Sequence, residues 1–472
     1  MSKGHYKIER LWVDNQIRQP RYFPHLVYKN KAEVLMIIGK WKEAEDIYVL
    51  NIDWSSQSEN AKLLADNKRL LGELLHLKGE FKRSLSLLEE SKVLYMGLYD
   101  QKGISLAVGY MGLVYDDKGN YEKAMECYER NLRISEELGD KEGISTAISC
   151  MGTVYYDKGD CDRAMECYNR LLQTSEELGN KWKISLAVGN MGIVHAEKGD
   201  YNKAMECYDR QLQICEELGH KKGVSFAVGS MGFVYGQKGD YKRAIECLGR
   251  QLQISEVLGE KRQISLAVGN LGVVYYLQGD YEKAMECYGR KLQICEELGD
   301  KRGLSSAIGN LGEVYRMKGD FKKAMEHFDH AISLGKELGI KYHLCEYLHS
   351  KANLFFILYK SDPMASSLNS ETKDLNDEAL QIAKEVERQD TIFVCKMLQA
   401  KLLGLNNKEE GIKELADMLK EYSENEQVAA LHYEIWKLNG REEHRIQALD
   451  LYQKLFAKTP MIEYMKRTEE LS

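Results

Sequence analysis

The stretch from Ile104 to Gly143 reads ISLAVGYMGLVYDDKGNYEKAMECYERNLRISEELGDKEG, and five similar copies follow it without a gap. These copies start forty residues apart, at Ile144, Ile184, Val224, Ile264 and Leu304. A glycine and an alanine mark the register in all six: Gly112, Gly152, Gly192, Gly232, Gly272 and Gly312, and Ala124, Ala164, Ala204, Ala244, Ala284 and Ala324. Self-similarity at a fixed period of this length indicates a repeat array, in which each unit buries its apolar surface against its neighbours.

Each copy carries the pattern of two helices. In the second copy, apolar or small residues recur three and four positions apart between Ala147 and Tyr155, as on the buried face of an amphipathic helix. Gly159 can take the left-handed conformation that ends this helix, and Asp160 can cap the next one. Gly179 then predicts the end of the second helix.

Packing explains the small and aromatic residues of the repeat. Gly152 and Ala164 let the two helix axes approach closely, and Tyr155 and Tyr168 fill the space beside them. Proline interrupts helices, and none of the four prolines of the chain lies between positions 25 and 362. We therefore predict an all-α fold, a right-handed α-solenoid superhelix of about eleven helix pairs.

The order of these residues resembles the tetratricopeptide signature. Leu or Met precedes the register glycine, a tyrosine follows three residues later, and Gly-Asp-Tyr leads to an alanine with a tyrosine four residues on. The forty-residue length and the Glu-Glu-Leu-Gly-Asp ending resemble the Leu-Gly-Asn repeat proteins, the kinesin light chains and bacterial signalling proteins that carry such repeats. The resemblance implies a helical superhelix that binds proteins, and it says little about which partner is bound.

The repeats lose their regularity toward both ends of the chain, where divergent copies suit a capping role. A stretch rich in Ser, Asp and Asn, with Pro363 in it, predicts a loop insertion at 361–376, after which the second helix resumes near Asp377. Two shorter pairs are predicted at about 390–423 and 424–458. The predicted organisation is a capping segment with aromatic residues at 1–24, degenerate repeats at 25–103, six regular repeats at 104–343 and degenerate repeats at 344–472.

Composition excludes several classes of function. The net charge of −7 argues against a nucleic-acid binder. No long apolar run predicts a membrane span, and residues 1–10 lack a signal-peptide core. Cys127, Cys167, Cys207, Cys247 and Cys287 share one repeat position. Equivalent positions of stacked helix pairs lie about 10 Å apart, too far for disulfides. We interpret the cysteines as buried or half-buried thiols in a reducing, cytoplasmic location.

No catalytic or cofactor motif occurs in the sequence. The phosphate-binding loop, the G-x-G-x-x-G turn and the H-E-x-x-H helix are all missing, and the eleven histidines are scattered. We predict that the chain is not an enzyme and needs no cofactor, metal or small-molecule ligand. A Cys–His pair that only the fold brings together would escape this search.

The candidate site is the inner wall of the superhelix, which the first helices of the repeats line. A helical wheel separates a buried side, which includes Ala107 and Met111, from a second face with Leu106, Gly109 and Tyr110. We predict that this second face is a groove for a protein or peptide. The residues predicted to line it are Tyr110, Leu113, Asp117, Asn190, Ile193, Phe233, Asn270, Asn310, Glu313 and Arg316.

Two features of this face have alternative explanations. Asparagine both donates and accepts hydrogen bonds. In the families that the repeat resembles, it contacts an extended ligand, and the alternative is a merely solvated position. Glycine within a helix costs about 1 kcal/mol relative to alanine. Either neighbouring first helices approach closely there, or a partner's backbone needs the room. The glycines concerned are Gly109, Gly189, Gly229, Gly269 and Gly309.

A second surface competes with the groove. Basic residues recur in the loops between repeats and could meet phosphate or an acidic partner, although neighbouring acidic residues favour a solvated, salt-bridged edge. They are Lys141, Lys181, Lys221, Lys222, Lys261, Arg262, Lys301, Arg302 and Lys341. We predict a scaffold, adaptor or regulatory subunit that holds a protein segment. The alternatives are a peptide-sensing regulator and the regulatory partner of a separate protease, kinase or cyclase.

Overall fold

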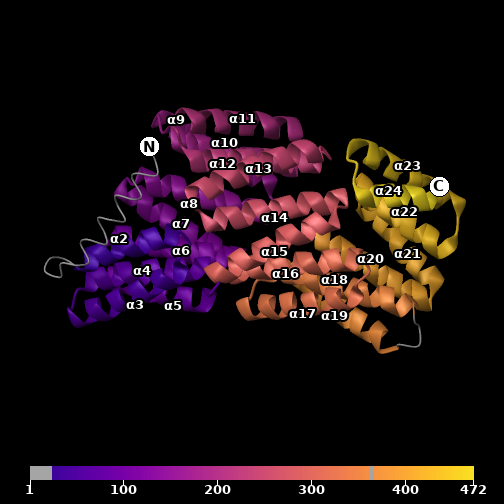
Figure 1. The fold of residues 1–472 in the computed structure, drawn as a ribbon, viewed down its shortest axis with the longest axis horizontal. Helices are drawn as coiled ribbons and strands as arrows, with labels where there is room; N and C mark the ends of the chain where they lie inside the picture. The colour runs from indigo at the N-terminus through magenta and orange to yellow at the C-terminus, as the bar shows by residue number, and fades with distance from the viewer. Residues whose placement is uncertain (1–23, 362–365) are drawn as a thin grey trace. The chain divides into compact units, whose positions relative to one another are not determined.

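The computed structural model describes residues 24–361 and 366–472, and all regular structure in these residues is α-helical (Figure 1). The first six pairs are α2 (Pro24–Ile37) and α3 (Trp41–Gln57), α4 (Ala61–Leu77) and α5 (Phe81–Gly97), α6 (Gln101–Asp117) and α7 (Tyr121–Leu138), α8 (Lys141–Asp157) and α9 (Cys161–Glu177), α10 (Lys181–Glu197) and α11 (Tyr201–Glu217), and α12 (Lys221–Gln237) and α13 (Tyr241–Leu258). The remaining helices are α14 (Lys261–Gln278) and α15 (Tyr281–Leu298), α16 (Lys301–Met317) and α17 (Phe321–Leu338), α18 (Lys341–Ser361) and α19 (Ser366–Glu385), α20 (Gln389–Asn406) and α21 (Lys408–Glu421), α22 (Asn425–Asn439) and α23 (Glu442–Lys458), and α24 (Ile462–Leu471). These eleven pairs and one further helix confirm the predicted all-α repeat array.

Local sequence signals set the helix ends. Gly159 and Gly179 have φ values of +77° and +62° and end the helices of the second copy, as predicted. The Asp160 carboxylate accepts a hydrogen bond from the backbone N–H of Arg163 at 3.1 Å, which satisfies a donor that the first turn of α9 leaves free. Nε of Arg163 also lies 3.4 Å from Oδ2 of Asp160. An ion pair therefore stands where a capping box would carry glutamate.

The register glycine packs directly under an aromatic ring of the second helix. A Cβ at Gly112 would lie 2.5 Å from Cε1 of Tyr128, and a Cβ at Gly192 would lie 2.6 Å from Cε1 of Tyr208. Real Cβ atoms do not come this close to other atoms, so the tyrosine needs the glycine. Ala164, in the other small position of the repeat, is fully buried. These residues serve packing, as the sequence predicts.

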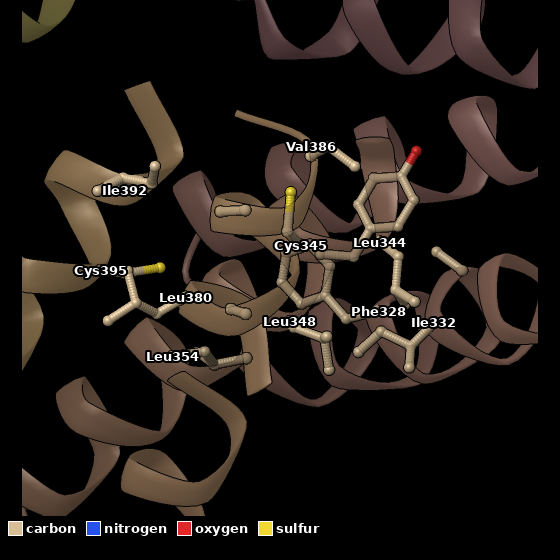
Figure 2. Close-up of a cluster of buried hydrophobic side chains, with 14 of the residues drawn as sticks. Phe328, Ile332, Leu344, Cys345, Leu348, Leu354, Leu380, Val386, Ile392 and Cys395 are labelled. Atoms are coloured by element: carbon tan, nitrogen blue, oxygen red, sulfur yellow. The ribbon is translucent and has the colours of Figure 1, made fainter. Parts of the chain in front are cut away.

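The largest buried cluster among the described residues joins five consecutive helices, from Ile308 of α16 to α20, near the end of the array (Figure 2). Phe328 and Ile332 come from α17, Leu348 from α18, Leu380 from α19 and Cys395 from α20. Each helix contributes an apolar stripe to one continuous core, which is how a repeat array obtains its stability.

The predicted loop insertion at 361–376 is wrong. α19 begins at Ser366 and runs for 20 residues, so helix occupies most of the segment. Thr372 and Asn376 are fully buried although they are polar. Thr372 donates its hydroxyl to the carbonyl of Leu368 at 2.6 Å, and the Asn376 amide donates to the carbonyl of Cys395 at 2.9 Å. Because these hydrogen bonds satisfy their polar groups, both residues can be buried in the core. The composition of the segment alone suggests a loop.

The chain divides into two compact units, and contacts within each unit join distant repeats. The first comprises Met1–Val154, Ser255–Ile264 and Gln293–Arg302, and the second comprises Tyr155–Ile254, Ser265–Leu292 and Gly303–Ser472. In the first unit, Leu298 of α15 is buried among Trp41, Ala44 and Leu75. In the second, the Thr459 hydroxyl donates to the carbonyl of Gln237 at 3.2 Å. Repeats therefore bury surface against distant copies as well as adjacent ones.

Two further predictions concern the capping segment and the absence of a membrane span, and the structure can be compared with them only in part. The capping segment at 1–24 lies outside them except for Pro24, where α2 begins. No helix among the described residues has the length and apolar character that would let it cross a bilayer.

Candidate partner-binding site

Four large apolar side chains are exposed on two neighbouring first helices. Phe226 and Phe233 of α12 are 44% and 50% exposed, and Leu266 and Val273 of α14 are 46% and 37% exposed. Residues seven apart lie on the same side of a helix, and the two helices are in contact, since a Cβ at Gly236 would lie 3.5 Å from Cγ2 of Val274. We call these four residues the exposed apolar face. Large apolar side chains exposed together on adjoining helices are typical of interaction sites in soluble proteins.

The polar positions of this face differ in accessibility. Asn270 lies between Leu266 and Val273 on α14 and is exposed. Asn190 and Asn310, at the equivalent positions of α10 and α16, are half-buried. An exposed amide beside apolar anchors can pair with the backbone of a bound segment.

Residues predicted for the groove in the first copy pack within the protein. Tyr110 is half-buried, with the guanidinium carbon of Arg69 5.7 Å from the centre of its ring. Burial and the nearby Glu73 carboxylate raise the pKa of Tyr110. Leu113 is half-buried against the cluster that contains Tyr121 and Tyr128. Ile193, further along the array, packs in the same way against the Tyr208 cluster.

Asp117 is held by two basic side chains of its own unit. Nε2 of His76 lies 2.5 Å from Oδ2 of Asp117, and the Arg302 guanidinium pairs with the same carboxylate. Burial alone would raise the pKa of Asp117, but the bond to His76 and the charge of Arg302 outweigh it and lower this pKa. Since Arg302 lies 185 residues further along the chain, Asp117 joins distant repeats.

Glu313 and Arg316 pair with each other on α16. Nε of Arg316 lies 2.8 Å from a carboxylate oxygen of Glu313. Burial alone would lower the pKa of Arg316, but the charges of Glu313, Tyr276 and Glu463 raise it. Glu463 belongs to α24, so the C-terminal helix contributes to the electrostatics of this predicted groove residue.

The glycines that precede the asparagine position face the protein core. A Cβ at Gly189 would lie 2.3 Å from Nε2 of Gln211, and a Cβ at Gly229 would lie 2.4 Å from Nε2 of Gln251. A Cβ at Gly309 would lie 2.2 Å from Cε1 of Tyr347, which belongs to the next first helix. The helical wheel placed these glycines on the groove face, and this placement is wrong because side chains of the core pack against them. Side chains of this chain fill the space that the second alternative reserves for a partner's backbone, and at Gly309 the neighbour is the next first helix, as the first alternative expects.

Phe226 and Leu266 were not predicted as site residues. Both occupy the repeat position of Leu106, which the helical wheel does place on the second face. Stepping by forty residues from Leu106 would have identified them. The signal was present in the repeat, and only the extrapolation from copy to copy was missing.

The basic residues of the loops between repeats form a salt-bridged edge wherever the structure describes their partners. Nζ of Lys181 lies 3.0 Å from a carboxylate oxygen of Glu217, and Nζ of Lys261 lies 2.7 Å from one of Glu297. Lys341 pairs with Glu385 in the same way at 2.9 Å. Exposed pairs of this kind contribute little to stability. Because their charges are locally balanced, these three lysines offer little to an acidic partner.

One trio, made of the buried Cys395 and Asn376 and the half-buried His349, has the residue types of a cysteine hydrolase. Sγ of Cys395 lies 3.6 Å from Nδ1 of His349, which lies 3.1 Å from the amide oxygen of Asn376. Cys395 is fully buried (Figure 2), and burial raises the pKa of its thiol to about 12. The thiol is therefore protonated at neutral pH and out of reach of a substrate, whereas nucleophilic attack requires an accessible thiolate. This trio is part of the core.

The other titratable groups do not assemble into a metal site in the part of the chain that the structure describes. No group of three or more His, Cys, Asp or Glu residues there could hold a metal ion. All eleven cysteines are free; Cys215, Cys295, Cys345 and Cys395 are buried, and the others are half-buried.

Comparison with known proteins identifies the repeat. The tetratricopeptide repeat family matches residues 104–177, 183–256, 224–297 and 262–337. No curated protein matches the chain.

Three solved structures match this chain at low sequence identity and with TM-scores below 0.5. BtubC (BKLC) from P. vanneervenii is 22% identical, with 47% of this chain and 91% of that chain covered and a TM-score of 0.37. A Rap protein complexed with competence and sporulation factor is 17% identical, with 76% and 99% covered and a TM-score of 0.49. A signal transduction ATPase with a tetratricopeptide repeat sensor from Pyrococcus horikoshii is 15% identical, with 72% and 52% covered and a TM-score of 0.46.

Proposed function

Because this chain is a tetratricopeptide-repeat protein, we propose that it is a non-catalytic scaffold that binds a segment of another protein on the exposed apolar face. The observation that carries the proposal is the repeated exposure of Phe226, Phe233, Leu266 and Val273 at equivalent positions of neighbouring first helices. Packing of the core does not require these side chains to be exposed, and their contact with water is unfavourable.

The energetics favour a partner that offers both apolar and polar groups. Full burial of a large apolar side chain contributes roughly 1.5–3 kcal/mol. The four side chains are only about half exposed, so covering them contributes roughly 3–5 kcal/mol. Micromolar affinity corresponds to about 8 kcal/mol, before the cost of ordering the partner. Hydrogen bonds to groups such as Asn270 would therefore have to supply part of the affinity.

The cellular role that fits this site is that of an adaptor or regulatory subunit. The free thiols suit a reducing compartment, which supports a cytoplasmic location. The buried state of Cys395 supports a role without catalysis.

Selection of peptides from a random display library on the full-length chain tests the proposal. Enriched peptides would be synthesised and titrated against the wild-type chain and against a Phe226→Ala/Phe233→Ala variant. We expect at least about tenfold weaker binding to the variant, which corresponds to about 1.4 kcal/mol. A matched control is Leu138→Ala, which removes an exposed leucine from a second helix, α7, and should leave the affinity unchanged. Equal affinity for the wild-type chain and the double variant would refute the site.

Affinity purification from the native host distinguishes the regulatory roles. Recovery of an enzyme in near-stoichiometric amount with the wild-type chain, and its loss with the double variant, would assign the chain as a regulatory subunit.

A further inference from the structure

One short turn near the end of the chain contacts the ends of both helices that carry the exposed apolar face. It comprises residues 459–462, from the end of α23 to the first residue of α24, and we call it the C-terminal turn. A Cβ at Gly239, two residues after α12 ends, would lie 2.0 Å from Cδ of Pro460. A Cβ at Gly279, directly after α14 ends, would lie 3.2 Å from Cγ1 of Ile462. Because Pro460 and Ile462 are two residues apart, at most about 7 Å of chain separates the two contacts.

Hydrogen bonds hold the C-terminal turn on the α12 side. The Thr459 hydroxyl donates to the carbonyl of Gln237 at 3.2 Å, and the Tyr241 hydroxyl donates to the carbonyl of Pro460 at 3.4 Å. Gln237 is the last residue of α12 and lies about one helical turn after Phe233. The C-terminal turn is therefore fixed to α12 close to one of the exposed aromatic side chains.

On the α14 side the contact is apolar and continues along α24. A Cβ at Gly279 would also lie 3.6 Å from Cβ of Ile462, so the two chains are in van der Waals contact there. Nζ of Lys466, one helical turn further along α24, lies 5.9 Å from the centre of the Tyr281 ring at the start of α15. The contact therefore covers the turn that follows α14 and the first residue of the next helix.

The core of the last helices supports the C-terminal turn. Met461 packs against the buried cluster that contains Tyr433, Tyr452 and Tyr464. Pro460 restricts the backbone of the turn further, because its ring fixes φ. A turn that is held on both sides in this way can fix the position of the helix ends that it contacts.

We propose that the C-terminal turn positions α12 and α14, so that the two halves of the exposed apolar face lie at the separation that the partner requires. Thr459, Pro460 and Ile462 are then positioning residues, which act through the two helices and do not contact the partner. A gap of about 0.5–1 Å removes a quarter to a half of a dispersion contact, so a small movement of one helix lowers the affinity. The inference rests on the function proposed above, because it concerns the same site.

Two substitutions in the C-terminal turn test the positioning. Thr459→Val keeps the shape of the side chain and removes the hydroxyl that donates to Gln237, and Ile462→Ala removes the contact with Gly279. A peptide selected on the full-length chain is titrated well below the melting temperature, and we expect each variant to bind it at least about threefold more weakly. The matched control is Thr468→Val, whose hydroxyl donates to the carbonyl of Tyr464 within α24 at 2.8 Å, and it should leave the affinity unchanged.

A reversible lock gives a complementary test. Gly279→Cys/Ile462→Cys would place two Cβ atoms about 3.6 Å apart, which is the separation found in disulfides. The oxidised and reduced forms carry the same substitutions, so their difference in affinity reports the link between the C-terminal turn and α14. We expect the oxidised form to bind the peptide at least about threefold more tightly than the reduced form, while the wild-type chain binds equally under both conditions. Weaker binding by the oxidised form would overturn the proposal, because the turn would then have to leave α14 before the partner binds.

The outcomes separate this proposal from the function on which it rests. Unchanged affinity in Thr459→Val and Ile462→Ala, together with weaker binding by Phe226→Ala/Phe233→Ala, would overturn the positioning and leave the site in place. A lower melting temperature with unchanged affinity would overturn it too, because the C-terminal turn would then only stabilise its unit. Equal affinity of the wild-type chain and Phe226→Ala/Phe233→Ala would refute the site itself.

Discussion

The Tyr241 hydroxyl donates a hydrogen bond to the backbone carbonyl of Pro460, 219 residues further along the chain, at 3.4 Å. The pyrrolidine ring of Pro460 also lies over Gly239, where a Cβ would come within 2.0 Å of Cδ of the proline. The turn before α24 thereby packs against the turn between α12 and α13, and it needs a glycine there. A contact of this kind lets distant copies in the same unit stabilise one another.

Substitution of Gly239 by alanine should destabilise the protein more than the same change at Gly199. The two glycines have φ values of +72° and +73°, so each substitution costs about 1–2 kcal/mol of backbone strain. At Gly199, no atom lies within 4 Å of the added Cβ, whereas at Gly239 Pro460 blocks it. We expect the clash to add about 1–3 kcal/mol to the loss at Gly239, measured by urea unfolding. Equal losses would show that the Pro460 contact is dispensable.

The half-buried His349 should make stability fall as the solution is acidified. Burial lowers the pKa of His349 below its ordinary value of 6.5, although the hydrogen bond to Asn376 and the charge of Glu313 act in the opposite direction. The unfolded chain then binds more protons than the folded one, so the contribution is complete above pH 6.5 and is lost as the pH falls through the lowered pKa. The free energy of unfolding should therefore be lower at about pH 5.5 than at about pH 7.5.

A His349→Gln variant isolates this contribution. Its loss of stability between the two pH values should be smaller than in the wild-type chain, because one titrating group is gone. His432 also has a lowered pKa, caused by burial and the nearby His444, so some pH dependence should remain. Identical slopes for the two proteins would contradict the assignment to His349.

Local signals in the sequence predicted most of the fold. The caps at Gly159 and Asp160 depend only on nearby residues, and the repeat period shows them six times. The exposed apolar face follows from the same period, since Phe233 and Val273 occupy one repeat position. The residues within one copy determine its helices and caps, and the six copies made this pattern recognisable in the sequence.

Contacts between distant copies could not be predicted in this way. The pairing of Asp117 with Arg302 depends on which repeats meet within a unit, and no single copy contains that information. The helix that begins at Ser366 was missed for a different reason. Asn376 is buried by virtue of a hydrogen bond to the carbonyl of Cys395, which the composition of the segment does not reveal.

Cys395 should resist alkylation in the folded protein. It is fully buried, and its thiol pKa is raised to about 12, so almost no accessible thiolate exists at neutral pH. Native iodoacetamide labelling followed by mass spectrometry should leave Cys395 unmodified while the half-buried Cys161 reacts first. Labelling in urea provides the control, since both cysteines should then react. Rapid native labelling of Cys395 would reopen the question of a catalytic thiol.

Replacement of Asn190, Asn270 and Asn310 by alanine should weaken binding of a selected peptide without lowering the melting temperature. Asn270 is exposed, so its amide is accessible to a peptide backbone, and the other two occupy the same repeat position on α10 and α16. Loss of hydrogen bonds to the ligand should reduce the affinity by about 1 kcal/mol for each bond removed. Alanine has a higher helix propensity than asparagine, so the helices themselves should not suffer. Calorimetric titration gives the affinity and thermal denaturation gives the stability. Unchanged affinity would remove the asparagines from the site and leave binding to the apolar side chains alone, whereas a lower melting temperature would mark them as structural residues.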